Sequence, residues 1–215
     1  MGRREAASRL LAGAIALLGW FALVAQLALL AALTTAKGGT VLGAALQYLG
    51  YFTILTNLLT ASVMSAIVLR GGVAATLQAG MTLSIAVVGI IYSLVLRTLW
   101  APTGWQKLVD ALLHDVIPVL AVAHWAIFGL RSVIGWRDVP LWLAWPTAFL
   151  VVALARGAVD GWYPYPFLDA GQFGYAIVLR NALAITALFA VLAASLIGLD
   201  RVLASIARRL SSRSS

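Results

Sequence analysis

The sequence predicts an all-α membrane protein that crosses the bilayer six times with both termini in the cytoplasm. Of its 215 residues, 63% are hydrophobic and only 10% are charged, and the mean hydropathy of +1.00 exceeds that of a typical soluble domain. The apolar residues form runs of roughly 20, the helix length that crosses a hydrocarbon layer of about 30 Å. The alternating segments of about ten residues that build an outer-membrane β-barrel are not found.

These runs predict six spans within one transmembrane domain, residues 1–215. The spans cover about 10–33, 48–69, 77–96, 109–130, 140–155 and 175–199. The first run is longer than the apolar core of a signal peptide, and more spans follow it. We therefore expect it to remain in the protein as a membrane anchor.

The Lys and Arg residues predict the orientation of the spans. Six spans place both termini, the second loop and the fourth loop on one side, and this side holds ten of the 15 Lys and Arg residues. The positive-inside rule assigns that side to the cytoplasm, so the second, fourth and sixth spans begin at the outer face. Because the basic residues lie at helix ends, the net charge of +8 indicates membrane orientation rather than nucleic-acid binding.

The longest predicted connection, about residues 156–174, lies on the outer side. Its central part, residues 162–169, contains Pro164, Pro166 and several aromatic side chains. Proline does not fit the interior of a regular helix, and aromatic residues suit the level of the lipid headgroups. We expect this segment to form an ordered cap over the outer helix ends.

His114 lies about one turn inside the outer end of the fourth span, where an ionisable residue is costly enough to suggest a function. Asp110 precedes it by four residues, shares its helix face and can hold a ring N–H. Pro118 has no N–H, which leaves the carbonyl of His114 open to another donor. The alternative is a histidine that only joins two helices by a hydrogen bond.

Thr53, Thr56 and Asn57 share one face near the outer end of the second span, at a depth similar to that of His114. A threonine hydroxyl becomes an effective nucleophile when an adjacent base takes its proton, so a Thr and His pair suits nucleophilic catalysis. Threonines in membranes also bond to their own helix or join helices, and this alternative stays open.

Arg97 at the outer end of the third span and Arg180 early in the sixth belong to the same layer. They could hold a carboxylate group of a ligand. They could also pair with Asp110, Asp115 or Asp169, and simple ion pairing or snorkelling to headgroups explains them equally well.

Neither a metal nor a cofactor is predicted. His124 lies about 15 Å deeper than His114 along the same span, so these two side chains cannot share a metal ion. The chain has no cysteine, which excludes disulfides, thiolate nucleophiles and cysteine metal sites. Walker, G-x-G-x-x-G and G-x-S-x-G motifs are missing, which disfavours nucleotide binding and an elbow-type serine hydrolase.

Three motifs follow one another along the chain. Phe52-Thr53 begins the second span, His114-x-x-x-Pro118 with Trp125 beyond it lies in the fourth, and Tyr163-Pro164-Tyr165-Pro166-Phe167-Leu168 precedes the sixth. Their order and approximate spacing over most of the chain resemble the androgen-induced integral membrane protein family. Animal members of that family are intramembrane threonine hydrolases that cleave fatty acid esters of hydroxy fatty acids with one Thr and one His.

The resemblance implies Thr53, rather than Thr56, as the nucleophile and His114 as its base. The second threonine and the basic C-terminus depart from the family pattern. The short chain is closer to the bacterial branch of the family, which implies a bacterial plasma membrane as the location.

The residues and the resemblance together predict a membrane-embedded hydrolase of lipid esters, such as fatty acid esters of hydroxy fatty acids, that enter from the outer leaflet. Asp110 would orient His114, and Asn57 or Arg180 would stabilise an oxyanion or anchor a carboxylate. Two alternatives stay open. The polar layer could bind or transport a lipid without catalysis, or it could only join helices in a structural membrane protein.

The topology can be tested with introduced cysteines, since the chain has none of its own. A cysteine in place of Lys37 or Asp169 is expected to react with a membrane-impermeant maleimide added outside the cell, whereas one in place of Ser212 is not. The reverse pattern would show that the predicted orientation is wrong.

Overall fold

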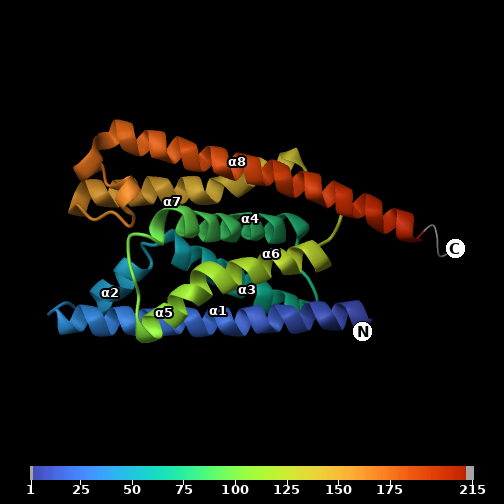
Figure 1. Ribbon diagram of the computed structural model, residues 1–215, viewed down its shortest axis with the longest axis horizontal. Coiled ribbons are helices and arrows are strands. Elements are labelled where there is room, and N and C mark those ends of the chain that lie inside the picture. The colour runs from blue at the N-terminus through green and yellow to red at the C-terminus, as the bar shows by residue number, and fades with distance from the viewer. Residues whose placement is uncertain (1, 212–215) are drawn as a thin grey trace. The chain divides into compact units, whose positions relative to one another are not determined.

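The computed structural model describes residues 2–211, and this part of the chain contains helices and no strand (Figure 1). Six helical segments are long and apolar enough to cross a membrane. They cover Arg3–Ala36, Phe52–Arg70, Ala75–Leu96, Gly104–Phe128, Trp136–Asp160 and Ala170–Arg209. The predicted all-α fold class and the six long apolar helices are confirmed, while Ser212, named in the topology test, lies outside the described residues.

The elements follow one another with short connections. In chain order they are α1 Arg3–Ala36, α2 Val41–Tyr48, α3 Phe52–Arg70, α4 Ala75–Ile91, the π turn η1 Tyr92–Leu96, α5 Gly104–Ala111, the π turn η2 Leu112–Val116, α6 Ile117–Phe128, the 3₁₀ turn η3 Trp136–Asp138, α7 Val139–Asp160, the 3₁₀ turn η4 Pro166–Leu168 and α8 Ala170–Ser211.

The start of the second span differs from the sequence prediction, which places it near residue 48. The chain forms the separate short helix α2 up to Tyr48, and α3 begins at Phe52 after Tyr51, whose backbone is extended at φ −98° and ψ 129°. Thr53 therefore lies in the first turn of its helix. Residues 48–52, around the junction of the two helices, are apolar or aromatic and carry no charge, which is why the sequence hides this boundary.

The chain divides into two compact units, which are described separately. The first contains the residues up to Ala74 together with Ser84–Phe128, and the second contains Ala75–Leu83 together with the chain from Gly129 onward. Helix α4 contributes its beginning to the second unit and its end to the first. A single domain stays a prediction.

In the first unit, α1 packs on α3 through small residues. A Cβ atom added at Gly19 would lie 3.1 Å from Ala61 Cβ, so glycine permits this close approach. The other buried residues of α1 repeat every three or four positions on the same face; they are Ala12, Ile15, Ala16, Ala22 and Leu23. Small side chains at a helix interface are how helices pack in a membrane, where lipid gives little hydrophobic drive for association.

Hydrogen bonds fix the shorter helices of the first unit on α1. Tyr48 Oη on α2 donates to Leu23 O at 2.8 Å, and Gln106 Nε2 on α5 donates to Gln26 Oε1 at 2.8 Å. At the start of α1, His124 Nε2 lies 3.2 Å from Ser8 O and 3.1 Å from Ser8 Oγ. The fully buried His124 of α6 thus joins α6 to α1.

In the second unit, α7 and α8 run side by side and the segment before α8 packs against both (Figure 1). Leu168 is buried with Ala153 of α7 and Val178 of α8. The rings of Tyr165 and Phe167 stack at 5.2 Å, and Asn181 Nδ2 of α8 donates to Phe167 O at 3.0 Å. Residues 162–169 are therefore an ordered segment held on two helices.

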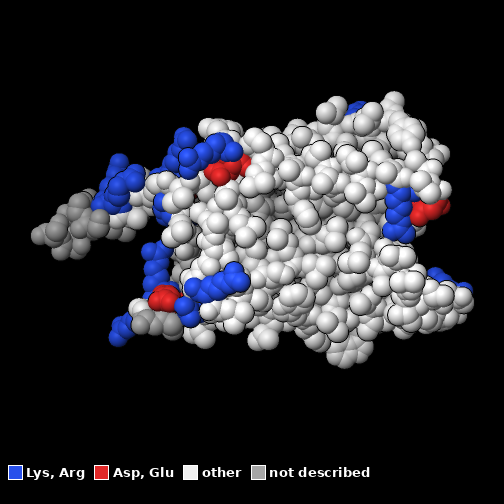
Figure 2. All heavy atoms as spheres, turned by 180° about the vertical axis from the view of Figure 1, so that it is seen from behind, with Lys and Arg blue, Asp and Glu red and all other residues white. Residues whose placement is uncertain are grey.

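Charged side chains are unevenly distributed over the surface. On the face drawn in Figure 2, Lys, Arg, Asp and Glu lie toward the two sides of the view, and the surface between them carries none. Inside the second unit, the fully buried Asp200 of α8 accepts a hydrogen bond from Ser132 N at 2.8 Å and lies 3.7 Å from Arg131. This carboxylate fixes the connection that precedes α7.

The packing of Tyr163 on α7 can be tested at Gly157. A Cβ atom at Gly157 would overlap the Tyr163 ring, whereas one at Gly198 in α8 meets nothing within 4 Å. We expect Gly157→Ala to lower the thermal unfolding midpoint in detergent, because overpacking costs about 1–3 kcal/mol. Gly198→Ala, the matched control, is expected to be neutral or slightly stabilising. Equal midpoints for the two variants would contradict this packing.

Candidate active site

Two π turns meet in the first unit. In η1, Arg97 N donates to Tyr92 O at 2.8 Å, and in η2, Ile117 N donates to Leu112 O, each five residues back along the chain. The turns bring Tyr92 and His114 together, with ring centroids 3.9 Å apart and planes inclined by 15°. Such turns are rare and occur often at functional sites, so their meeting point is the candidate site.

Gly89 lets the end of α4 approach η2 closely enough for this stacking. A Cβ atom at Gly89 would lie 3.2 Å from His114 O and 3.2 Å from Pro118 Cβ. A larger residue would push α4 away from η2. The sequence pattern of a helix that is apolar on all sides does not reveal this contact.

Asp110 is the hydrogen-bonded centre of the site. His114 Nδ1 lies 3.0 Å from Asp110 O and 3.2 Å from Asp110 Oδ1. The Tyr92 hydroxyl donates to Asp110 Oδ2, and Trp100 Nε1 donates to Oδ1 over a longer 3.4 Å. Two acceptors at Nδ1 favour the tautomer that carries its proton there, which leaves the lone pair on Nε2.

Asn57 links the first turn of α3 to η2. Its Nδ2 donates to Thr53 O at 2.9 Å and to Leu113 O at 3.2 Å. In the five-residue pattern of η2, the partner of Leu113 O would be the N–H of residue 118, and Pro118 has none. The Asn57 amide supplies that missing donor. Its Nδ2 thus joins the backbone at Thr53 to the backbone at Leu113, the residue before His114.

These contacts change the role expected of Asn57. Both hydrogens of Nδ2 are directed at carbonyl oxygens, so the side chain has no donor left for an oxyanion. Its Oδ1 is buried and has no hydrogen-bond partner among residues 2–211. Asn57 therefore presents an acceptor, and not the donor that the sequence suggested.

Both candidate nucleophiles are buried on α3. Thr53 is 8% exposed and Thr56 is fully buried, and Thr56 O accepts a hydrogen bond from Thr60 Oγ1 at 2.8 Å. Of the two, Thr53 is the one whose carbonyl shares the Asn57 amide with Leu113. A contact between the Thr53 hydroxyl and the imidazole stays a prediction.

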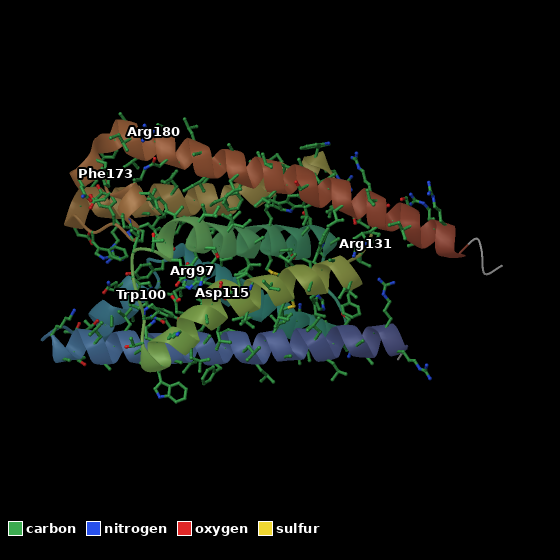
Figure 3. The ribbon with its side chains drawn as sticks, viewed as in Figure 1. Arg97, Trp100, Asp115, Arg131, Phe173 and Arg180 are labelled. Carbon is green, nitrogen blue, oxygen red and sulfur yellow. The ribbon has the colours of Figure 1, made fainter. Side chains whose placement is uncertain are left out.

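The two arginines of the predicted layer fall in different units. Arg97 forms an ion pair with Asp115 across the two π turns (Figure 3). Its guanidinium carbon lies 4.8 Å from the Tyr92 ring centroid. The hydrogen bond to Asp115 raises the pKa of Arg97, which favours its charged form. Arg180 is exposed on α8 of the second unit.

Tyr92 and Trp100 belong to the site, although the sequence alone does not single them out. Both are aromatic residues near the end of a span, where a role in anchoring the helix at the membrane interface is the usual explanation. Tyr92 is only 4% exposed, and a buried tyrosine hydroxyl needs a partner. The spacing of Tyr92 to Arg97, five residues, would have suggested a shared face only if the π turn were known.

Comparisons of the chain with models of protein families, with curated proteins and with solved structures gave no match. The resemblance to the androgen-induced integral membrane protein family therefore rests on the short motifs of the sequence and stays a prediction. Within the described part of the chain, no three His, Asp, Glu or Cys side chains gather where they could hold a metal ion.

The contacts predict opposite tautomers for the two histidines of the chain. His114 Nδ1 faces Asp110, whereas His124 Nε2 faces Ser8 O. In ¹⁵N-histidine-labelled protein, we expect the neutral ring of His114 to carry its proton on Nδ1 and that of His124 on Nε2. His124→Gln assigns the signals. Finding the proton of His114 on Nε2 would contradict the proposed contact with Asp110.

Proposed function

We propose that the protein is a membrane-embedded hydrolase of lipid esters, with Thr53 as nucleophile and His114 as general base. The observation that carries the proposal is the contact of His114 Nδ1 with Asp110 inside a membrane span. A base whose second nitrogen is held by a carboxylate is the arrangement that activates a hydroxyl nucleophile. No cofactor takes part.

Asp110 has two tasks in this mechanism. It keeps the lone pair on His114 Nε2 and stabilises the imidazolium that forms when this nitrogen accepts a proton. The Tyr92 hydroxyl and Trp100 Nε1 hold the carboxylate in place from two other segments of the chain. Fixed dipoles of this kind act strongly in a site that lipid shields from water.

Thr53 is assigned as the nucleophile because its turn of α3 is joined to η2 through Asn57. Its Oγ attacks the ester carbonyl carbon while its proton passes to His114 Nε2. The same proton then moves to the leaving alcohol oxygen as the ester C–O bond breaks, and the acyl group stays on Thr53. Water completes the cycle by releasing the fatty acid.

The substrate class follows from the location of the site. The polar residues lie within spans of the first unit, so the reacting bond belongs to a molecule that enters from lipid. The excess of Lys and Arg on the side of both termini supports an outward-facing site. The family resemblance supports a bacterial plasma membrane as the location. The family resemblance supports fatty acid esters of hydroxy fatty acids, or similar esters, as substrates.

A fluorescent alkyl fluorophosphonate tests the proposal, because it reacts with an activated hydroxyl and not with an ordinary one. We expect labelling of the wild-type protein in detergent micelles and background labelling of Thr53→Ala and of His114→Ala. Asp110→Asn should slow labelling by roughly 10²-fold or more, the size of a general-base contribution. Peptide mapping should locate the label on Thr53.

Matched controls come from the same helices. Thr60 is a buried threonine of α3 whose hydroxyl bonds to Thr56 O, and His124 joins α6 to α1. Thr60→Ala and His124→Gln should keep full labelling. Loss of label in Thr56→Ala alone would move the nucleophile one turn along α3. A wild-type protein that retains lipid on purification and never reacts would instead support a lipid-binding or transport protein.

A further inference from the structure

Asn57 Oδ1 is a buried acceptor that the protein itself does not satisfy. The residue is 0% exposed, and Oδ1 has no hydrogen-bond partner in the described chain. The hydroxyl of Thr60, one turn along the same face, is already committed to Thr56 O at 2.8 Å. An unpaired carbonyl oxygen is costly in a low-dielectric interior, so a donor from outside the chain is expected there.

The orientation of the amide is fixed by its two other contacts. Nδ2 faces the carbonyl oxygens of Thr53 and Leu113 at 2.9 and 3.2 Å. Exchanging nitrogen and oxygen would direct an acceptor at two acceptors and lose both hydrogen bonds. Oδ1 is therefore an acceptor in the folded protein, and the ligand that it receives must carry an O–H or N–H.

The position of Oδ1 ties this ligand to the proposed reaction. The same amide holds the carbonyl of the proposed nucleophile and the carbonyl of the residue before His114. A small donor bound to Oδ1 is therefore adjacent to the amide that joins the first turn of α3 to η2. Water is the donor that fits a closed, polar spot of this kind and that the reaction consumes.

We propose that Asn57 is a positioning residue that binds, through Oδ1, the water that hydrolyses the acyl group on Thr53. This inference rests on the proposed function. One hydrogen of this water is donated to Oδ1, and the other is transferred as a proton to His114 Nε2. The water oxygen attacks the acyl carbonyl carbon. The bond from that carbon to Thr53 Oγ breaks, Oγ takes the proton from His114, and the fatty acid leaves.

The test compares two variants of nearly equal size with 4-nitrophenyl octanoate as the substrate. Asn57→Leu removes the acceptor, whereas Asn57→Asp keeps an oxygen at the same place. Release of 4-nitrophenol reports acylation, and mass spectrometry of the quenched protein reports acyl-Thr53. A residue with only a structural role would affect both steps together, so the ratio of the two steps is the decisive readout.

For Asn57→Leu we expect a burst of about one 4-nitrophenol per protein, a steady rate lowered about tenfold or more, and accumulated acyl-Thr53. Asn57→Asp also loses both Nδ2 hydrogen bonds and should acylate more slowly than the wild type, but it keeps an acceptor for the water and should turn over without a burst. Asn57→Ala also lacks the acceptor and should behave as Asn57→Leu does. It replaces the leucine variant in the test if that variant does not fold.

Equal slowing of acylation and deacylation in the folded leucine or alanine variant would overturn the role of Asn57 in positioning water. A burst in Asn57→Asp as large as in Asn57→Leu would overturn it as well. A wild-type protein that neither hydrolyses the ester nor reacts with the fluorophosphonate would instead refute the proposed function itself, which separates the two failures.

Discussion

A carboxylate inside a membrane span must find its hydrogen-bond donors within the protein, and in the first unit this constraint falls on Asp110. Its donors come from three segments: Tyr92 at the start of η1, Trp100 in the following connection and His114 one turn further along its own helix. Loss of this group would remove the partner of all three. The arrangement of the candidate site therefore depends on where the helix turns place Asp110.

The π turns decide that placement. Each has five-residue hydrogen bonding at the level where the polar residues lie. Turn η1 ends the helix that α4 begins, whereas η2 lies between α5 and α6. Pro118 would leave Leu113 O without a donor in this pattern, and Asn57 of α3 supplies one at 3.2 Å. A side chain of another helix thus satisfies the carbonyl oxygen that the π turn leaves without a donor. Irregular helices are tolerated in membranes when their free backbone groups find such partners.

The sequence was sufficient for the fold class and for the approximate spans, because the order of residues along the chain shows the apolar runs and the charges between them directly. It also identified His114 and Asp110, since a four-residue spacing places two side chains on one helix face. Tyr92, Trp100 and the acceptor of Asn57 could not be predicted. Their contacts depend on the rotation of one helix against another, and a helix that is apolar all round carries no period that fixes this rotation.

An ionisable residue in a span suggests a function, but the two histidines show that its contacts must be known before a function is assigned. Both lie in Gly104–Phe128, ten residues apart. His124 is 1% exposed and joins α6 to Ser8 of α1, a contact that accounts for the residue without any reaction. His114 keeps a 14% exposed side chain, bonds through Nδ1 to a carboxylate and stacks on a tyrosine that bonds to the same carboxylate. The contacts of His124 join two helices, whereas those of His114 favour a proton on Nδ1 and leave the lone pair of Nε2 for the proposed reaction.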